Sequence, residues 1–282
     1  MHLVDQMTGP GAGDWGSLQP TPVERALIRA CRALPRTWWG SRLTVLLRRP
    51  VKYGRVAPLD VEVWGLRLRL HRRGNFSETA LLFSPHCFDP VEREVLRDRL
   101  RPGATFLDIG ANAAAYSFWV WSVLGGACTI LAVEPDPELS ARVSFNIGQN
   151  RCLDMTVLNV AVGDRPGRAT FTINPAVRGQ NSLLGVPGAT GTRTIEVEVR
   201  SLALIVDQRG YHRIDAMKVD IEGMEEAVLG PFLDTVDPSR WPRLLILESK
   251  EIEEHRRLRD RLEGLGYETL QRAGLNLIME RA

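Results

Sequence analysis

Residues 105–116 read Thr-Phe-Leu-Asp-Ile-Gly-Ala-Asn-Ala-Ala-Ala-Tyr, and this stretch decides the fold class. Its first five residues are mostly apolar and rich in strand formers, which predicts a buried strand over 105–109. The turn Gly110-Ala111-Asn112 then opens an apolar stretch that predicts a helix to about Leu124. A strand, a glycine turn and a helix in this order predict the first unit of a nucleotide-binding α/β sheet.

Strands and helices continue to alternate towards the end of the chain. Further strands are predicted at 130–133, 156–162, 216–220 and 244–247, and helices at 137–150, 224–233 and 251–265. This pattern is typical of a mostly parallel, Rossmann-like sheet with helices on both faces. Two short final segments, 267–270 and 275–279, predict an antiparallel hairpin that completes a seven-stranded sheet.

The domain organisation follows from where this alternation starts and where it is interrupted. Residues 1–21 are rich in Gly, Pro and polar residues and predict a disordered tail. Residues 22–100 predict an extension with helices and a short strand pair at 61–70, and residues 101–282 predict the α/β domain. Alternating segments at 169–173 and 194–199 predict a hairpin inserted at about 167–202.

Composition and charge exclude some classes of protein and leave others open. The net charge of +2 gives no strong field for a polyanion, so a nucleic-acid partner is not implied. The four cysteines, at positions 31, 87, 128 and 152, lack a metal-ligand spacing and predict reduced thiols in a cytoplasmic protein. Residues 109–133 carry no charge, but their glycine, serine and asparagine residues predict a turn, a helix and a strand rather than a membrane span.

A basic stretch lies in the extension. Residues 24–55 contain nine Arg or Lys residues and one acid, Glu24. Two interpretations stay open: a basic surface for an acidic partner, a carrier protein or a membrane, and a solvated helix face without a partner.

Acidic residues end three of the predicted parallel strands. Asp108 ends the first, Glu134 the second and Asp220 the fourth, and ligands of such sheets bind beyond these carboxyl ends. Glu134 follows Gly110 by 24 positions, which suits a carboxylate that accepts hydrogen bonds from the ribose of an adenosine. As the structural alternative, Asp and Gly at these places shape turns only.

Two cofactor classes compete for this predicted crevice. A dinucleotide needs second and third glycines in the turn, and Asn112 and Ala115 stand at those places. Asp108 would also repel a pyrophosphate, whereas it suits the ammonium and sulfonium of S-adenosyl-L-methionine (SAM). SAM is therefore favoured over NAD.

The same residues resemble the FkbM family of SAM-dependent O-methyltransferases. The resemblance covers about residues 76–250: the aspartate-glycine-alanine-asparagine turn, the pair Glu134-Pro135, the third-strand end Ala161-Val-Gly-Asp164 and the block Lys218-Val-Asp-Ile-Glu-Gly-Met-Glu225. Ala114 stands where the family usually has glycine, and Ala203 where it usually has aspartate.

The resemblance implies a class I methyltransferase fold, SAM as methyl donor and S-adenosyl-L-homocysteine as product. The cofactor-binding residues expected are Asp108, Gly110, Ala111, Asn112, Tyr116, Ser117, Glu134, Pro135, Ala161 and Asp220. Asn181 and Ser182 of the inserted loop, together with His86 before the core, are expected at the acceptor, a hydroxyl of a small metabolite, natural product or sugar.

The Lys-Asp-Glu block carries the predicted chemistry. Residues two apart in a strand share a face, so Lys218, Asp220 and Glu222 are expected to project together. Asp220 is expected to bind SAM or poise the acceptor, and Glu222 to accept the hydroxyl proton. Alternatively, Lys218 only pairs with a carboxylate, and Glu222 caps the next helix.

Other functions compete with this one. No metal is expected, although two carboxylates can hold Mg²⁺. His212 and His255 are expected at the surface. An NAD-dependent oxidoreductase and an inactive SAM-binding or partner-docking protein remain the alternative functions.

Overall fold

A computed structural model describes residues 13–174, 192–249 and 253–281 of the chain. Its helices are α1 (Pro22–Ala33), α2 (Trp38–Leu47), α3 (Arg49–Tyr53), α4 (Phe76–Phe83), α5 (Pro90–Arg99), α6 (Ala115–Val123), α7 (Pro137–Asn150), α8 (Leu202–Gln208), α9 (Glu225–Thr235) and α10 (Glu253–Gly264), with short 3-10 turns η1 (Pro85–Cys87) and η3 (Pro238–Arg240). Its strands are β1 (Leu59–Val63), β2 (Leu66–Leu70), β3 (Ala104–Ile109), β4 (Cys128–Val133), β5 (Met155–Leu158), β6 (Ala161–Val162), β7 (Gly167–Ile173), β8 (Arg193–Arg200), β9 (Ala216–Val219), β10 (Leu244–Glu248), β11 (Tyr267–Ala273) and β12 (Asn276–Arg281).

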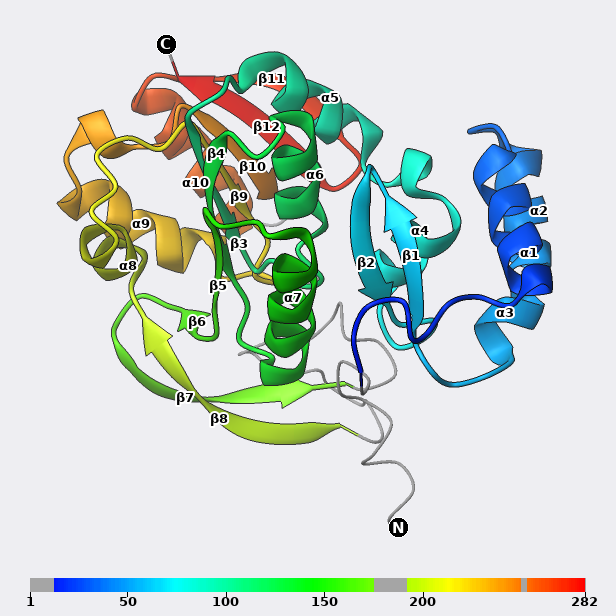
Figure 1. The fold of residues 1–282 in the computed structure, drawn as a ribbon. Helices are drawn as coiled ribbons and strands as arrows, with labels where there is room; N and C mark the ends of the chain where they lie inside the picture. Colours follow the sequence, from blue (N-terminus) through cyan, green and yellow to red (C-terminus); the bar gives the residue numbers. More distant parts are fainter. Residues whose placement is uncertain (1–12, 175–191, 250–252, 282) are drawn as a thin grey trace.

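The central sheet confirms the predicted fold class. It has seven strands in the order β11-β12-β10-β9-β3-β4-β5 (Figure 1). Strands β5, β4, β3, β9 and β10 are parallel, and β12 lies antiparallel to both β10 and β11. The chain leaves β3 towards β4 on one side and returns to β9 on the other, so the topological switch point lies at the carboxyl ends of β3 and β9.

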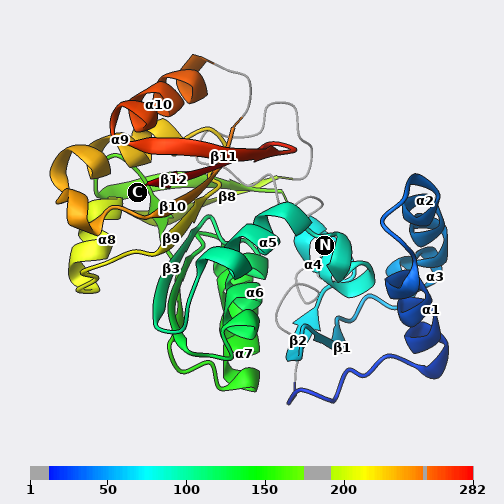
Figure 2. The same cartoon turned by 90° about the horizontal axis from the view of Figure 1, so that it is seen from above.

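Alternate residues of the strands point to opposite faces of this sheet. Phe106, Ile130 and Ile246 join one hydrophobic cluster with α5, α6, α7 and the extension. Leu107, Leu131 and Leu245 join the other cluster with α8, α9 and α10. Helices therefore cover both faces, as Figure 2 shows, and the strands are buried as a parallel sheet requires.

The inserted segment forms a separate small sheet. β7 and β8 pair antiparallel, as predicted, and β6 joins β8 in a three-stranded sheet of order β6-β8-β7. The strand predicted at 156–162 is thus split, because β5 belongs to the central sheet and β6 to the small one. Helix α8 was not predicted; Ser201 caps it by accepting a hydrogen bond from the Leu204 backbone N–H at 3.3 Å.

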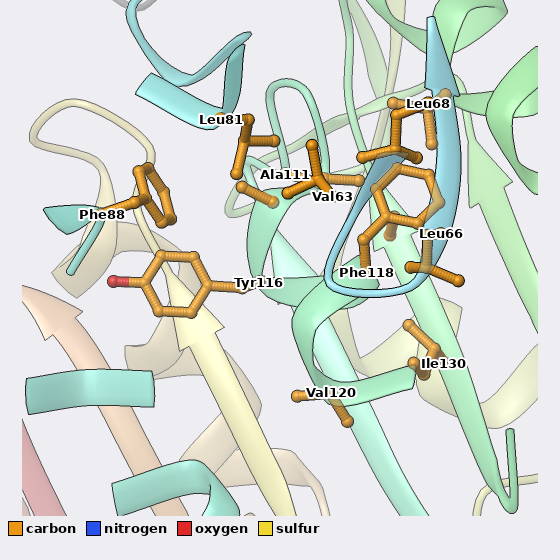
Figure 3. Packing of buried hydrophobic residues seen from close by; sticks show 14 of the residues in the cluster. Val63, Leu66, Leu68, Leu81, Phe88, Ala111, Tyr116, Phe118, Val120 and Ile130 are labelled. Atoms are coloured by element: carbon orange, nitrogen blue, oxygen red, sulfur yellow. The ribbon is translucent and has the colours of Figure 1, made fainter. Parts of the chain in front are cut away.

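The extension contains the predicted strand pair, β1 and β2, and packs on α6 and α7. Figure 3 shows Leu66 and Leu68 of β2 beside Phe118 of α6, and the three residues belong to one buried cluster. The edge of β2 is fixed by α7, because the Arg69 backbone N–H donates to the Asn146 side chain at 2.7 Å. The extension and the sheet therefore share one core.

The predicted disordered tail is too long. Residues 1–12 lie outside the described part, but residues 13–21 contact the extension. The buried Asp60 carboxylate accepts hydrogen bonds from the backbone N–H groups of Gly16 at 2.7 Å and Leu18 at 3.0 Å, and it pairs with Arg69 at 2.7 Å. A buried carboxylate that needs these donors holds the segment in place.

The apolar stretch 109–133 spans β3, α6 and β4, as predicted. No helix in the described part of the chain is long and apolar enough to cross a membrane. The thiols of Cys31, Cys128 and Cys152 are buried and that of Cys87 is exposed, and all four are free.

Candidate active site

Acidic side chains gather at the carboxyl edge of the parallel strands. Asp108 lies near the end of β3, and Glu134 and Asp220 directly follow β4 and β9. Because these strands are parallel neighbours, the three residues lie along one edge of the sheet. Glu248 ends the neighbouring strand β10 at the same edge. Sequence reasoning missed Glu248 because it considered only the first, second and fourth strands, although Glu248 follows the predicted strand 244–247 as Glu134 follows 130–133.

Asp108 is a buried carboxylate with an unused oxygen. Its Oδ2 accepts hydrogen bonds from the Ser117 hydroxyl at 2.7 Å and backbone N–H at 3.2 Å. Its Oδ1 is buried and has no hydrogen-bond partner in the described part of the chain. Burial raises the pKa of Asp108 to about 6, although the Lys218 ammonium and Ser117 oppose the shift. A cationic ligand group would supply what Oδ1 lacks.

Glu134 links the turn after β3 to the turn after β4. Its Oε2 accepts from the Asn112 backbone N–H at 2.7 Å, and its Oε1 from the Asp136 backbone N–H at 2.8 Å. Burial raises the pKa of Glu134 to about 8, and the two backbone donors oppose the shift. Each carboxylate oxygen keeps a further acceptor site, so the side chain can still bind hydroxyl groups.

The turn after β3 depends on close backbone approach. Gly110 has φ of 76°, and a Cβ there would lie 1.9 Å from the Asp220 carbonyl oxygen, so only glycine fits between β3 and β9. Ala114, where the resembled family has glycine, also has a positive φ of 53°. The substitution therefore places an alanine in a left-handed conformation rather than tightening helix packing.

Lys218 is a buried cation among these acids. Its Nζ lies 2.7 Å from Asp220 Oδ2 and 4.9 Å from the centre of the Tyr116 ring. Burial disfavours the ammonium, but Asp220 and Asp108 outweigh it and raise the pKa of Lys218. The Tyr116 hydroxyl donates to Asp89 Oδ2 at 2.8 Å, and its ring contacts Phe88 edge-on at 5.7 Å (Figure 3). The predicted pairing of Lys218 with a carboxylate is therefore present.

Asp220, Glu222 and Glu248 form a cluster of carboxylates. One oxygen of each lies within 4.8 Å of the others, and all three side chains are half-buried. Strand β9 ends at Val219 and Glu222 has φ of 54°, so regular strand alternation does not bring Glu222 to Asp220; the turn does. Three carboxylates at this spacing can accept a proton or hold a divalent cation.

Glu225 holds the turn that carries Asp220 and Glu222. Its Oε1 accepts from the backbone N–H groups of Ile221 at 3.0 Å and Gly223 at 3.4 Å. Its Oε2 lies 3.0 Å from Nε2 of His255 on α10, and both side chains are buried. The expectation of a surface His255 is therefore wrong, because α10 packs against α9 and His255 is buried.

The remaining predicted residues are dispersed along the crevice and beyond it. Ala111, Asn112, Ser117 and Pro135 lie in or beside the two turns, whereas Ala161 belongs to the small sheet with β8. The His86 Nε2 lies 2.9 Å from the Leu34 carbonyl oxygen, within the extension. Asn181 and Ser182 lie outside the described residues. The cofactor and substrate roles of all these residues stay predictions.

A hollow of about 310 Å³ lies at the opposite edge of the sheet. It is lined at the amino ends of β3 and β10 by Ala104, Thr105 and Leu244, with Arg99, Arg101 and Arg243 around them. Ligands of open α/β sheets bind at the carboxyl edge, so this hollow is not the candidate active site.

The strand order, the antiparallel last strand and the acids at the switch point define the chain as a Rossmann-like α/β protein of the class I methyltransferase type. It belongs to the FkbM methyltransferase domain family, whose model matches residues 108–269.

Among curated relatives, the chain is 28% identical over 187 residues to the 31-O-demethyl-FK506 methyltransferase FkbM of Streptomyces tacrolimicus, with 54% of this chain and 70% of the relative covered. It is 27% identical over 165 residues to the 2-O-methyltransferase NoeI of Sinorhizobium fredii, with 54% of this chain and 66% of that relative covered. The solved structure of an O-methyltransferase from Bacillus cereus with SAH is similar at a TM-score of 0.42 and 13% identity, over 67% of this chain and 80% of that one.

Proposed function

We propose that this methyltransferase transfers the methyl group of SAM to a hydroxyl oxygen of a small acceptor molecule. The observation that carries the proposal is the buried, unused Oδ1 of Asp108 at the switch point of a class I methyltransferase sheet. A buried carboxylate oxygen without a donor is costly, and a ligand ammonium would offset that cost.

The residues present fit this donor better than a dinucleotide. Asp108 would bind the methionine ammonium, and Glu134, at the end of the next strand, would accept hydrogen bonds from the ribose hydroxyls. The Asp108 carboxylate would repel a pyrophosphate. The bound donor supplies a methyl group activated by a positively charged sulfur.

The carboxylate cluster would handle the acceptor proton. A hydroxyl that gains a methyl group must lose its proton, and a half-buried carboxylate within reach accepts it. We assign this role to Glu222, and Lys218 fixes Asp220 beside it through the 2.7 Å ion pair. Glu248 offers a second acceptor and is the competing assignment.

The acceptor class is inferred from the relatives. The names of both curated relatives specify O-methyl transfer, and one names a small molecule, 31-O-demethyl-FK506, as its acceptor. The net charge of +2 offers no strong attraction for a polyanion. A small hydroxylated metabolite or sugar is therefore proposed.

The test is transfer of labelled methyl from SAM into pools of hydroxylated small molecules. Glu222→Gln keeps the size of the side chain but removes the base, and we expect a loss of about 10²- to 10⁴-fold in kcat with little change in SAM affinity. Glu248→Gln is the matched variant. Full activity of Glu222→Gln would overturn the base assignment, and inactivity of Glu248→Gln alone would transfer it to Glu248.

Metal dependence is tested in the same assay. We propose that no metal is needed, because the Lys218 ammonium already neutralises Asp220. Activity should be unchanged after treatment with EDTA. A loss that Mg²⁺ restores would instead make the Asp220, Glu222 and Glu248 cluster a cation site.

A further inference from the structure

Helix α2 buries small residues and exposes large apolar ones, the reverse of an ordinary surface helix. Its buried positions are Gly40 and Thr44. A Cβ at Gly40 would lie 2.2 Å from the Pro35 carbonyl oxygen, so this side of α2 packs by close backbone approach. The inward face is therefore closed mainly by small residues, with the partly buried Leu47 packed against the core at the end of the helix.

The opposite side carries the large apolar residues. We call it the α2 outer face; it consists of Trp38 (72% exposed), Trp39 (54%), Leu43 (37%), Val45 (43%) and Leu46 (58%). Of the twelve large hydrophobic residues that are exposed in the described part of the chain, eight lie between residues 23 and 56. Apolar residues gathered in this way mark an interaction site rather than ordinary surface.

Cations lie on α2 and in the segments that flank it. Residues 25–55 contain no Asp or Glu. Arg42 lies over the Trp38 ring at 4.5 Å, and Lys52 lies 5.7 Å from the centre of the Tyr53 ring, which is itself 61% exposed. Glu24, the acid that precedes the stretch, is engaged by Arg55 at 2.9 Å and Arg72 at 2.6 Å. The exposed Arg36 and Arg49 flank the two ends of α2.

The position of α2 leaves this face accessible. Figures 1 and 2 both place α1, α2 and α3 beside the β1–β2 hairpin, on the side away from the central sheet, with α2 at the margin of the molecule. The candidate active site lies at the carboxyl ends of β3 and β9. A large flat surface can therefore contact α2 without covering the sheet edge.

We propose that the α2 outer face docks on an anionic lipid bilayer. Tryptophan and tyrosine favour the boundary between headgroups and hydrocarbon, and arginine and lysine beside them are attracted to anionic headgroups. α2 has ten residues, so it would lie in the boundary rather than cross it. A partner protein with an acidic, apolar surface is the competing occupant, but the paired tryptophans with interleaved cations favour the bilayer.

The experiment uses the full chain and sedimenting vesicles. We expect binding to vesicles of phosphatidylcholine mixed equally with phosphatidylglycerol, at least about tenfold weaker binding to phosphatidylcholine alone, and weakening by salt. Trp38→Ser with Trp39→Ser, and separately Arg42→Gln with Arg49→Gln, should each weaken binding about tenfold or more. Leu153→Ser (89% exposed) and Arg165→Gln with Arg168→Gln are the matched controls and should bind as wild type.

Folding and self-association are measured on the same samples. An unchanged unfolding temperature of the tryptophan variant shows that its weaker vesicle binding does not come from unfolding. If that temperature falls, the arginine variant tests the proposal instead. Failure of the wild type to bind either vesicle would overturn the proposal. Binding by the tryptophan variant equal to wild type would also overturn it. So would light scattering that shows a wild-type dimer which the tryptophan changes dissociate, because a second copy would then cover this face.

Discussion

Lys218 Nζ and Asp220 Oδ2 lie 2.7 Å apart, and they join a buried ammonium to a carboxylate that is 37% exposed. The same ammonium lies over the Tyr116 ring and lowers the pKa of the buried Asp108 against the effect of burial. One cation therefore balances the carboxylates of two neighbouring strands, β3 and β9.

Removing this cation should destabilise the protein in a pH-dependent way. Lys218→Met leaves Asp108 and Asp220 buried or half-buried without their counter-charge, and we expect a loss of about 3 kcal/mol at pH 8. The loss should be smaller at pH 5, because Asp108, with a pKa of about 6, is then largely protonated and needs no cation. Denaturant unfolding at the two pH values checks this. An equal loss at both would show that Lys218 does not act through Asp108.

Asp108 should make SAM binding depend on pH. Burial raises the pKa of Asp108 to about 6 in the free protein. Protonated Asp108 therefore contributes fully to folding stability below about pH 4, and this contribution is lost as the pH rises through 6. A bound ammonium requires the ionised form, so SAM affinity should rise about tenfold between pH 5 and 7.

Asp108→Asn is the matched variant for this pH dependence. It keeps an acceptor for Ser117 but cannot ionise, so it should bind SAM weakly and without this pH dependence. Calorimetric titration at several pH values measures both. The same pH slope in the variant would exclude Asp108 as its source.

Ala114→Gly should stabilise the protein. Ala114 has φ of 53°, which costs an L-residue about 1–2 kcal/mol, while the greater freedom of glycine in the unfolded chain offsets about half of that. A net gain of about 0.5–1 kcal/mol is expected in denaturant unfolding. Ala113→Gly is the control, because Ala113 is not in the left-handed region and should lose about 0.5–1 kcal/mol. Destabilisation by both changes would contradict the assignment of strain to Ala114.

Glu225 should act on the reaction by positioning the Asp220–Glu222 turn. Glu225→Ala leaves the backbone N–H groups of Ile221 and Gly223 without their acceptor, and we expect about 2–3 kcal/mol lower stability. The kcat should fall more than SAM affinity, because Asp108 and Glu134 lie on other strands. Glu226→Ala, which removes a surface pair with Arg257 at 3.5 Å, should change neither. An unchanged kcat in Glu225→Ala would show that the turn does not need this anchor.

The central sheet and its acidic edge were predictable because both follow from short-range rules. Hydrophobic runs of strand length give the parallel strands, and an acid at the end of a run or directly after it lies at the carboxyl edge, which identified Asp108, Glu134 and Asp220. The Glu225–His255 contact was not predictable, since it joins residues 30 positions apart on two packed helices. The outward orientation of Trp38 and Trp39 was also hidden, because the packing of α2 on its neighbouring helices α1 and α3 decides which face is inside.

Titration calorimetry of the wild type and Glu134→Ala with SAM, S-adenosyl-L-homocysteine and NAD tests the central claim most directly. We expect the wild type to bind the first two and not NAD. We expect Glu134→Ala to bind SAM at least about tenfold more weakly, because it lacks the side chain proposed to hydrogen-bond the two ribose hydroxyls. Glu268→Ala, on the exposed side of β11, is the control. Binding of NAD by the wild type, or of SAM by Glu134→Ala with wild-type affinity, would contradict the account.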